Sequence, residues 1–233
     1  MFLLLNYFLD VLFPKRCIGC LKLVKDDLNF CEDCLVKIRI FNSFFCSKCG
    51  ARIPEFQKIC HKGEKFILGA ATDYNDIVKQ AIWRLKFKFI KRGAYPLANL
   101  LINYFKNLNF SNKKNKNFIV IPIPLSKKRF KERGFNQSEL IAQIFANYFN
   151  FKLEKNVLYR WKHAKPQSEI DDFNLRRQNV LNCFKVLNKD LITNKNIILI
   201  DDVVTSGATF KEAVKVLKES GAKFILALAI AKA

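Results

Sequence analysis

The stretch from residue 197 to residue 209 constrains the fold of this chain more than any other. Ile197–Ile200 is a short, wholly apolar run, as expected of a parallel strand that is buried on both faces. Asp201 and Asp202 stand where that strand is expected to end, and the small, hydroxyl-rich segment Thr205–Thr209 follows with one glycine. This order predicts an α/β fold with polar groups gathered at the carboxyl end of a central strand.

The residues after this loop predict a helix. Apolar side chains recur at helical spacing from Phe210 to Ser220, and Gly221 is suited to end the helix. Ligands of open α/β sheets bind beyond the carboxyl ends of the strands, and a helix N-terminus there suits a phosphate. The two carboxylates can accept hydrogen bonds from hydroxyls such as those of a ribose. The alternative is an ordinary strand–turn–helix junction, with the acids as solvated turn residues and Thr209 as a helix cap.

This pattern resembles the phosphoribosyl-pyrophosphate (PRPP) motif of type I phosphoribosyltransferases, and every position of that motif is filled. In the family, the paired acids hold the ribose hydroxyls and the loop holds the 5′-phosphate. The resemblance implies PRPP as ligand or substrate, together with magnesium. The positions that carry it are Asp201, Asp202, Val203, Thr205, Ser206, Gly207, Ala208 and Thr209.

The remainder of the 233 residues suits one α/β domain and a small additional module. Strand-like runs alternate with helical patterns, which indicates a parallel sheet. The strand-like runs are Phe118–Pro124, Ile197–Ile200 and Phe224–Ile230, and the helical patterns are Pro96–Asn107 and Gln137–Tyr148. Ile77–Phe89 fits a helix or a second strand. We expect a cysteine-rich module in residues 1–64 and a type I phosphoribosyltransferase-like α/β domain in residues 65–233.

Seven of the eight cysteines fall in the segment that begins with Cys17 and ends with Cys60. Cys17 and Cys20 form one Cys-x-x-Cys pair, and Cys31 and Cys34 form another. Two such turns complete a tetrahedral zinc site. In a reducing cytoplasm these pairs are more often metal ligands than disulfides, so the sequence predicts one zinc ion here.

A third pair, Cys46 and Cys49, needs further ligands, and Cys60 is the first candidate. The fourth ligand is either His61 or water, because adjacent residues rarely reach one metal together. A decayed site and a cross-braced arrangement of the pairs are the alternatives. Cys183 stands alone in an apolar setting and is expected in the core.

The chain carries 41 basic and 20 acidic residues, a net charge of +21, which favours polyanionic partners. Fifteen of the basic residues lie from Lys79 to Arg133 with aromatics among them, a composition typical of single-stranded nucleic-acid binding. The residues expected to contact DNA are Arg84, Lys86, Lys88, Lys91, Arg92, Arg129 and Arg133. The alternative is a solvated basic face above core aromatics, with Leu85, Phe87 and Phe89 alternating with cations along a strand.

The order of the motifs resembles that of the competence protein F (ComF) family over nearly the whole chain. The cysteine module is followed by Ile121–Pro124, Arg133–Gln137, Arg176–Asn179 and the PRPP motif. The resemblance implies a role in natural transformation, with PRPP and single-stranded DNA bound on the cytoplasmic side and DNA-uptake or helicase proteins as partners. It also implies further phosphate ligands, in the loop after Pro124 and in a flexible loop. These ligands are Ser126, Lys127, Arg160 and Lys165.

Two other functions fit the same residues. The chain is alternatively an active phosphoribosyltransferase that transfers phosphoribosyl from PRPP to a base or an amine, or a regulator that only senses PRPP. Catalysis needs little acid–base chemistry, because pyrophosphate leaves readily once its charge is neutralised. The motif alone therefore leaves open whether the chain is an enzyme.

The apolar segment Met1–Phe13 has one apolar helical face. It is too short to span a bilayer, and without a basic flank it makes a poor signal peptide. We expect a docking helix here and no transmembrane span. The expected location is the cytoplasm, with any membrane association made through partners.

Overall fold

The computed structural model describes residues 15–24, 30–53, 60–61, 65–88, 90–108, 117–162 and 181–233. Three expectations lie outside the described residues: the docking helix of residues 1–13, the segment Arg176–Asn179 and the phosphate ligand Lys165. No helix in the described ranges is long and apolar enough to cross a membrane.

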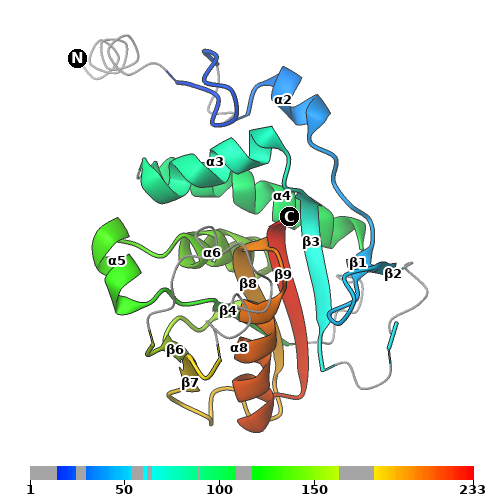
Figure 1. Cartoon of the computed structure of the whole chain (residues 1–233), viewed down its shortest axis with the longest axis vertical. Helices are drawn as coiled ribbons and strands as arrows, with labels where there is room; N and C mark the ends of the chain where they lie inside the picture. Colours follow the sequence, from blue (N-terminus) through cyan, green and yellow to red (C-terminus); the bar gives the residue numbers. More distant parts are fainter. Residues whose placement is uncertain are drawn as a thin grey trace.

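A mostly parallel sheet confirms the expected α/β architecture (Figure 1). Within the described ranges the sheet has seven strands in the order β2-β1-β3-β9-β8-β4-β5. Strands β3, β9, β8, β4 and β5 run parallel, whereas β1 is antiparallel to both of its neighbours. The strands are β1 (Phe44–Phe45), β2 (Arg52–Ile53), β3 (Ile67–Asp73), β4 (Phe118–Pro122), β5 (Lys152–Leu153), β8 (Asn196–Val204) and β9 (Phe224–Lys232). A separate antiparallel pair consists of β6 (Leu158–Arg160) and β7 (Phe184–Val186).

Helices cover both faces of this sheet. In Figure 1, α4 and α6 lie behind the sheet, α8 lies in front of it, and α3 crosses above its upper end. The helices are α2 (Glu32–Lys37), α3 (Asp76–Phe87), α4 (Ala94–Asn107), α5 (Lys127–Arg133), α6 (Gln137–Phe149) and α8 (Ala208–Glu219), with the 3₁₀ turn η1 at Lys91–Gly93. Helices α4 and α6 pack through edge-to-face rings, with the centroids of Phe105 and Phe145 5.3 Å apart. The buried core is therefore continuous from the sheet into the helical layer.

One glycine allows α4 to approach the sheet closely. A methyl group added at Gly69 of β3 would lie 2.9 Å from the Tyr104 hydroxyl oxygen, closer than packed side chains allow. The fully buried Tyr104 donates its hydroxyl hydrogen to the Ser43 carbonyl at 2.7 Å. This contact ties α4 to the segment just before β1.

The structure corrects two expectations about local conformation. Strand β8 continues to Val204, so Asp201 and Asp202 lie within the strand and not after it. The ambiguous segment after residue 76 is helix α3, so the expected strand alternation around Phe87 is wrong. The Asn75 side chain accepts a hydrogen bond from the Val78 N–H at 3.0 Å, a helix cap that settles this choice.

Candidate functional site

The acid pair on β8 has two different sets of partners. The Ser138 hydroxyl donates to Asp201 Oδ1 at 2.8 Å, and the Asp202 N–H donates to the same oxygen at 2.9 Å. The Lys86 ammonium lies 2.9 Å from Asp202 Oδ1. Asp202 is 4% exposed, and its Oδ2 is buried with no hydrogen-bond partner among the described residues. The pair therefore retains acceptor capacity beyond these contacts.

The surroundings of Asp201 disfavour its charged form. Burial and, next, the negative charge of Asp202 raise the pKa of Asp201 to about 7. The Ser138 hydroxyl and the Lys86 ammonium act in the opposite direction. Hydrogen-bond donors of a ligand, such as ribose hydroxyls, would therefore stabilise the ionised form of Asp201.

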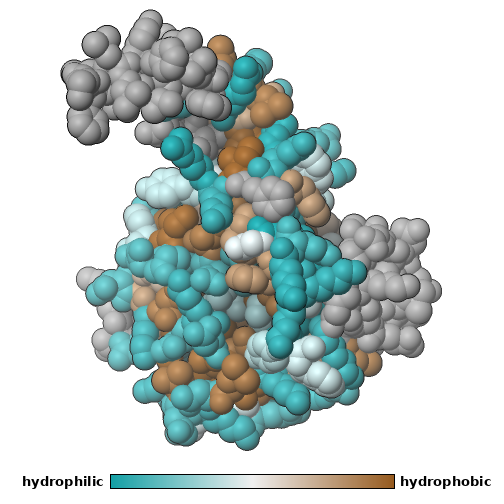
Figure 2. Space-filling model, turned by 90° about the vertical axis from the view of Figure 1, so that its left-hand side faces the viewer, coloured by the Kyte–Doolittle hydropathy of each residue, from teal (hydrophilic) through white to brown (hydrophobic). Residues whose placement is uncertain are grey.

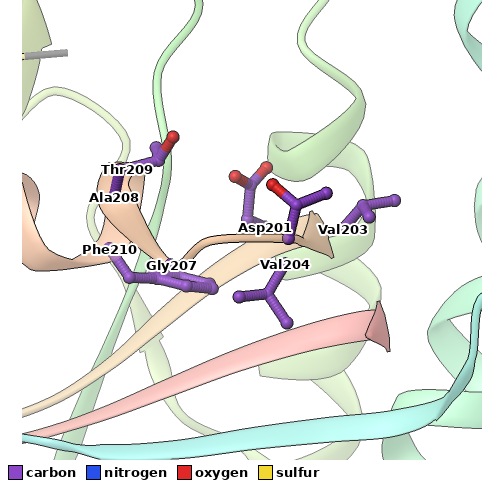
Figure 3. A pocket seen from close by; sticks show the side chains of 8 residues that line it. Asp201, Val203, Val204, Gly207, Ala208, Thr209 and Phe210 are labelled. Atoms are coloured by element: carbon purple, nitrogen blue, oxygen red, sulfur yellow. The ribbon is translucent and has the colours of Figure 1, made fainter. Parts of the chain in front are cut away.

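The loop after β8 is built around a left-handed residue. Gly207 has φ +71° and stands immediately before α8, so the chain can turn from the strand directly into the helix. A pocket lies here, lined by Asp201, Val203, Val204, Thr205, Gly207, Ala208, Thr209 and Phe210. Figure 3 shows the Asp201 carboxylate and the Thr209 side chain pointing to the same side of the loop. Ala208, Thr209 and Phe210, the first residues of α8, line this pocket, and a helix N-terminus suits a phosphate.

The Arg133–Gln137 string is the turn between α5 and α6. Gly134 ends α5 with φ +69°, and Asn136 begins α6 by accepting from the Ser138 N–H at 3.1 Å. The Asn136 amide also donates to the Ile123 carbonyl at 3.0 Å, next to the end of β4. These contacts place Ser138 beside Asp201. The sequence reasoning missed Ser138, although its position one residue after the string was a usable signal.

Arg129 and Arg133 lie near the acid pair, and Arg160 lies near Arg129. Burial lowers the pKa of Arg129 and of Arg133, and the charges of Asp201 and Asp202 oppose that shift. Arg160 lies in β6, so its expected place in a flexible loop is wrong. It is 7% exposed, its guanidinium lies 5.5 Å from the Phe184 ring centroid, and its Nε has no hydrogen-bond partner among the described residues.

The other predicted phosphate ligands follow β4. Ser126 begins α5 by accepting from the Arg129 N–H at 3.4 Å and is 2% exposed. Lys127 is exposed at the first position of α5. The Ser126 side chain thus shapes the loop, whereas the Lys127 ammonium is accessible to an anion.

Two clusters of metal-ligating side chains occupy the N-terminal part. One contains Cys17, Cys20, Cys31 and Cys34, and the other contains Cys46, Cys49, Cys60 and His61, with the ligand atoms of each within 4.8 Å of one another. The Cys20–Cys31 and Cys49–Cys60 sulfurs lie 3.6 and 3.9 Å apart, close to the spacing of about 3.8 Å that a tetrahedron with Zn–S bonds of about 2.3 Å requires. Both donor sets fit zinc, and the pairs are used in sequence order and are not cross-braced.

His61 completes the second cluster despite following Cys60 directly. Its Nδ1 lies 3.3 Å from Cys46 Sγ, so the adjacent Cys60 and His61 reach the same site. The tight turn that this requires was not evident from the sequence. Cys183 is fully buried, as expected.

The seven cations expected to bind DNA divide into two groups. Lys88, Lys91 and Arg92 are exposed. Arg84, Lys86, Arg129 and Arg133 are partly buried. The buried group faces the protein: Arg84 donates to the Ile18 and Gly19 carbonyls, and Lys86 pairs with Asp202. Lys86, which was grouped with the cations expected to contact DNA, therefore lies at the acid pair.

Aromatic side chains accompany the exposed cations. Trp83, Phe87, Tyr95 and Phe130 are between 43% and 57% exposed, so the alternative that placed the aromatics in the core is wrong for them, whereas Phe135 is buried. The Lys88 ammonium lies 5.5 Å from the Trp83 ring centroid. Figure 2 looks onto the side where α5 lies in Figure 1, and apolar surface there is framed by hydrophilic side chains.

Comparisons with known proteins match the N-terminal cysteine-rich part and the α/β part of the chain. A family model described as "Double zinc ribbon domain" matches residues 8–63, and one described as "Phosphoribosyl transferase domain" matches residues 90–233. The Competence protein ComFC of Bacillus subtilis is 29% identical over 210 residues, which cover 85% of this chain and 82% of that protein. The Competence protein F of Haemophilus influenzae is 28% identical over 233 residues, covering 95% and 98%. The DNA utilization protein YhgH of Salmonella typhimurium is 25% identical over 206 residues, covering 88% and 85%. The similarity inferred from the motif order is confirmed.

Proposed function

The chain belongs to the phosphoribosyl transferase domain family, and from that premise we propose that it binds PRPP at the acid pair of β8 and acts in the uptake and use of DNA. The observation that carries the PRPP assignment is that Asp201, Asp202 and the loop Thr205–Thr209 lie together at the carboxyl end of the central strand β8. The carboxylates accept the ribose hydroxyls, and the loop and the N-terminus of α8 receive the 5′-phosphate.

Cations that suit the pyrophosphate group follow β4, next to the strand that carries the acid pair. Lys127 is exposed at the start of α5, and Arg129 and Arg133 lie close enough to the acid pair for its charges to affect their pKa values. Magnesium, when bound with PRPP, supplies charge neutralisation at the phosphates. The chain's own residues orient the ribose and hold the phosphate ends.

The direct test is calorimetric titration of magnesium-PRPP into the wild type, Asp202→Asn and Thr209→Ala. Each variant loses a hydrogen bond to the ligand, so we expect a loss of about 1–3 kcal/mol in binding free energy. Lys195→Ala is the matched control, because Lys195 is exposed at the opposite end of β8. Unchanged affinity in both variants would remove the assignment.

The DNA-related part rests on the relatives and on the exposed cations. The three relatives described above carry the words competence or DNA utilization in their names. Lys88, Lys91 and Arg92 are exposed, the Lys88 ammonium lies 5.5 Å from the Trp83 ring centroid, and Trp83 and Phe87 are exposed as well. Exposed cations with exposed rings suit the backbone and bases of a single strand. We propose this surface, without Arg84 and Lys86, as the single-stranded DNA surface.

Pyrophosphate release decides between binding and transfer. Incubation of the protein with magnesium-PRPP, alone and with single-stranded DNA or a panel of bases and amines, measures it directly. Release that depends on an acceptor makes the chain a transferase. Binding without release makes it a PRPP-binding competence protein.

A further inference from the structure

Helix α3 lies between the two parts of the chain that the comparisons recognise. The matched segments end at residue 63 and begin at residue 90, so Asp76–Phe87 belongs to neither. Two cations of this helix, Arg84 and Lys86, turn inward to different targets. One target is the first zinc cluster, and the other is the acid pair.

The contact with the first zinc cluster is close. Arg84 Nη1 donates to the Ile18 carbonyl and, at 2.6 Å, to the Gly19 carbonyl. Both carbonyls lie between the cluster ligands Cys17 and Cys20. We call the Cys17–Cys20 segment the first knuckle and the Cys31–Cys34 segment the second. The charge-assisted hydrogen bonds of Arg84 fix the backbone of the first knuckle against α3.

Packing reinforces this contact on both sides of the knuckle. A methyl group added at Gly19 would lie 2.7 Å from Cγ2 of Ile77 in α3, and one added at Gly93 of η1 would clash with Ile18 Cδ1. Ile18 is 5% exposed. The knuckle therefore docks directly on α3 and η1, and a displacement of either side disturbs the other.

The contact between Lys86 and the acid pair is also largely buried. The side chains of Lys86 and Asp202 are 20% and 6% exposed, with 2.9 Å between Nζ and Oδ1. The second oxygen of Asp202 has no hydrogen-bond partner among the described residues, so Lys86 supplies the charge compensation for this carboxylate. Removing one partner of a buried ion pair leaves an uncompensated charge and is strongly unfavourable.

We propose that α3 couples the first zinc site to the acid pair, so that occupancy of the cluster of Cys17, Cys20, Cys31 and Cys34 raises the affinity of the site on β8 for a phosphorylated ribose. Zinc, when bound, holds the two knuckles together. Arg84 transmits the position of the first knuckle to α3, and Lys86 is the positioning residue that compensates the charge of Asp202 and orients its carboxylate. This inference rests on the proposed PRPP site, and it gives the zinc module a role in the ligand site.

The test compares magnesium-PRPP affinity by calorimetry in zinc-loaded wild type and four variants. Lys86→Met keeps the aliphatic stem but removes the charge, and we expect at least a tenfold loss of affinity. Lys86→Arg restores a cation and keeps the affinity within about threefold of the wild type. Arg84→Ala loses affinity while elemental analysis still finds the wild-type zinc content. Lys79→Ala, an exposed position on the same helix, binds as the wild type does.

A double-mutant cycle and metal removal complete the test. Because Arg84 and Lys86 act through one helix, Arg84→Ala adds little to the loss caused by Lys86→Met. Removing zinc with a chelator that is dialysed away before magnesium-PRPP is added lowers wild-type affinity towards that of Lys86→Met. The same treatment accelerates amide hydrogen exchange in α3, which is read without ligand. The inference alone is overturned if Lys86→Met binds PRPP as tightly as the wild type does. It is also overturned if zinc removal leaves amide hydrogen exchange in α3 unchanged. A wild type that binds no PRPP overturns the proposed function and the inference with it.

Discussion

Asp201→Asn tests whether the acid pair, without a ligand, lowers the free energy of unfolding. Burial and the charge of Asp202 raise the pKa of Asp201 from 3.8 to about 7. In the pH range between these two values the native state binds more protons at this site than the unfolded chain does. The contribution of Asp201 to wild-type stability therefore falls as the pH rises through this range and is constant above it. Asp201→Asn removes the titration and keeps an acceptor for the Ser138 hydroxyl.

The magnitude follows from the displacement of the pKa. A shift from 3.8 to about 7, at about 1.4 kcal/mol per pKa unit, has an upper limit of about 4 kcal/mol. Asp201 is partly exposed, so water screens part of the penalty. We expect the variant to be more stable than the wild type by about 1–3 kcal/mol at pH 8 and by about half of that at pH 5.5.

Urea unfolding of zinc-loaded wild type and variant at several pH values measures this difference. The zinc thiolates titrate in both proteins, so their contribution cancels in the comparison. Ser138→Ala serves as a second probe, because it removes the donor that favours the ionised form and lowers stability at pH 8. A difference between Asp201→Asn and the wild type that does not change with pH would refute the reasoning, as would a variant less stable at pH 8.

Three further predictions concern the loop, the metal sites and the basic surface. The methyl group of Gly207→Ala would meet no atom closer than 4.0 Å, but the residue must adopt φ +71°. We therefore expect a loss of about 1 kcal/mol in unfolding free energy together with weaker PRPP binding. Wild-type PRPP affinity in this variant would contradict a role of the loop geometry. Cys34→Ser and Cys49→Ser should each lower zinc from two ions to one per chain by elemental analysis, whereas Cys183→Ala should leave two; no change in either serine variant speaks against two sites. Lys88→Glu, Lys91→Glu and Arg92→Glu combined should reduce the salt slope of single-stranded DNA binding by roughly 0.7 for each lost phosphate contact, with Lys195→Glu as control, and a wild-type slope excludes this surface.

The strand–loop–helix around the acid pair could be predicted because its signals are local. Apolar runs, two acids and a glycine-containing loop are adjacent in the sequence, and β8, Gly207 and α8 follow that order in the structure. The zinc clusters were predictable for the same reason, since Cys-x-x-Cys spacing is local. The extension of β8 beyond Ile200 was not, because Val203 and Val204 pair with β9, and that pairing depends on the sheet order.

The contacts of the acid pair were not predictable, because they join distant parts of the chain. Lys86 and Asp202 are 116 residues apart, and Ser138 and Asp201 are 63 apart. Composition grouped Lys86 with the cations expected to bind DNA, since charge alone does not reveal which side of α3 faces the sheet. Only the packing of α3 across the end of the sheet brings that ammonium to Asp202.

A structure of the protein with magnesium-PRPP bound tests the central claim most directly. The account predicts ribose hydroxyls within hydrogen-bond distance, about 2.6–3.2 Å, of the Asp201 and Asp202 carboxylates. It also predicts the 5′-phosphate on the backbone N–H groups of Thr205–Thr209. A ligand held only by the exposed cations Lys88, Lys91 and Arg92, with the acid pair still closed on Ser138 and Lys86, would contradict it.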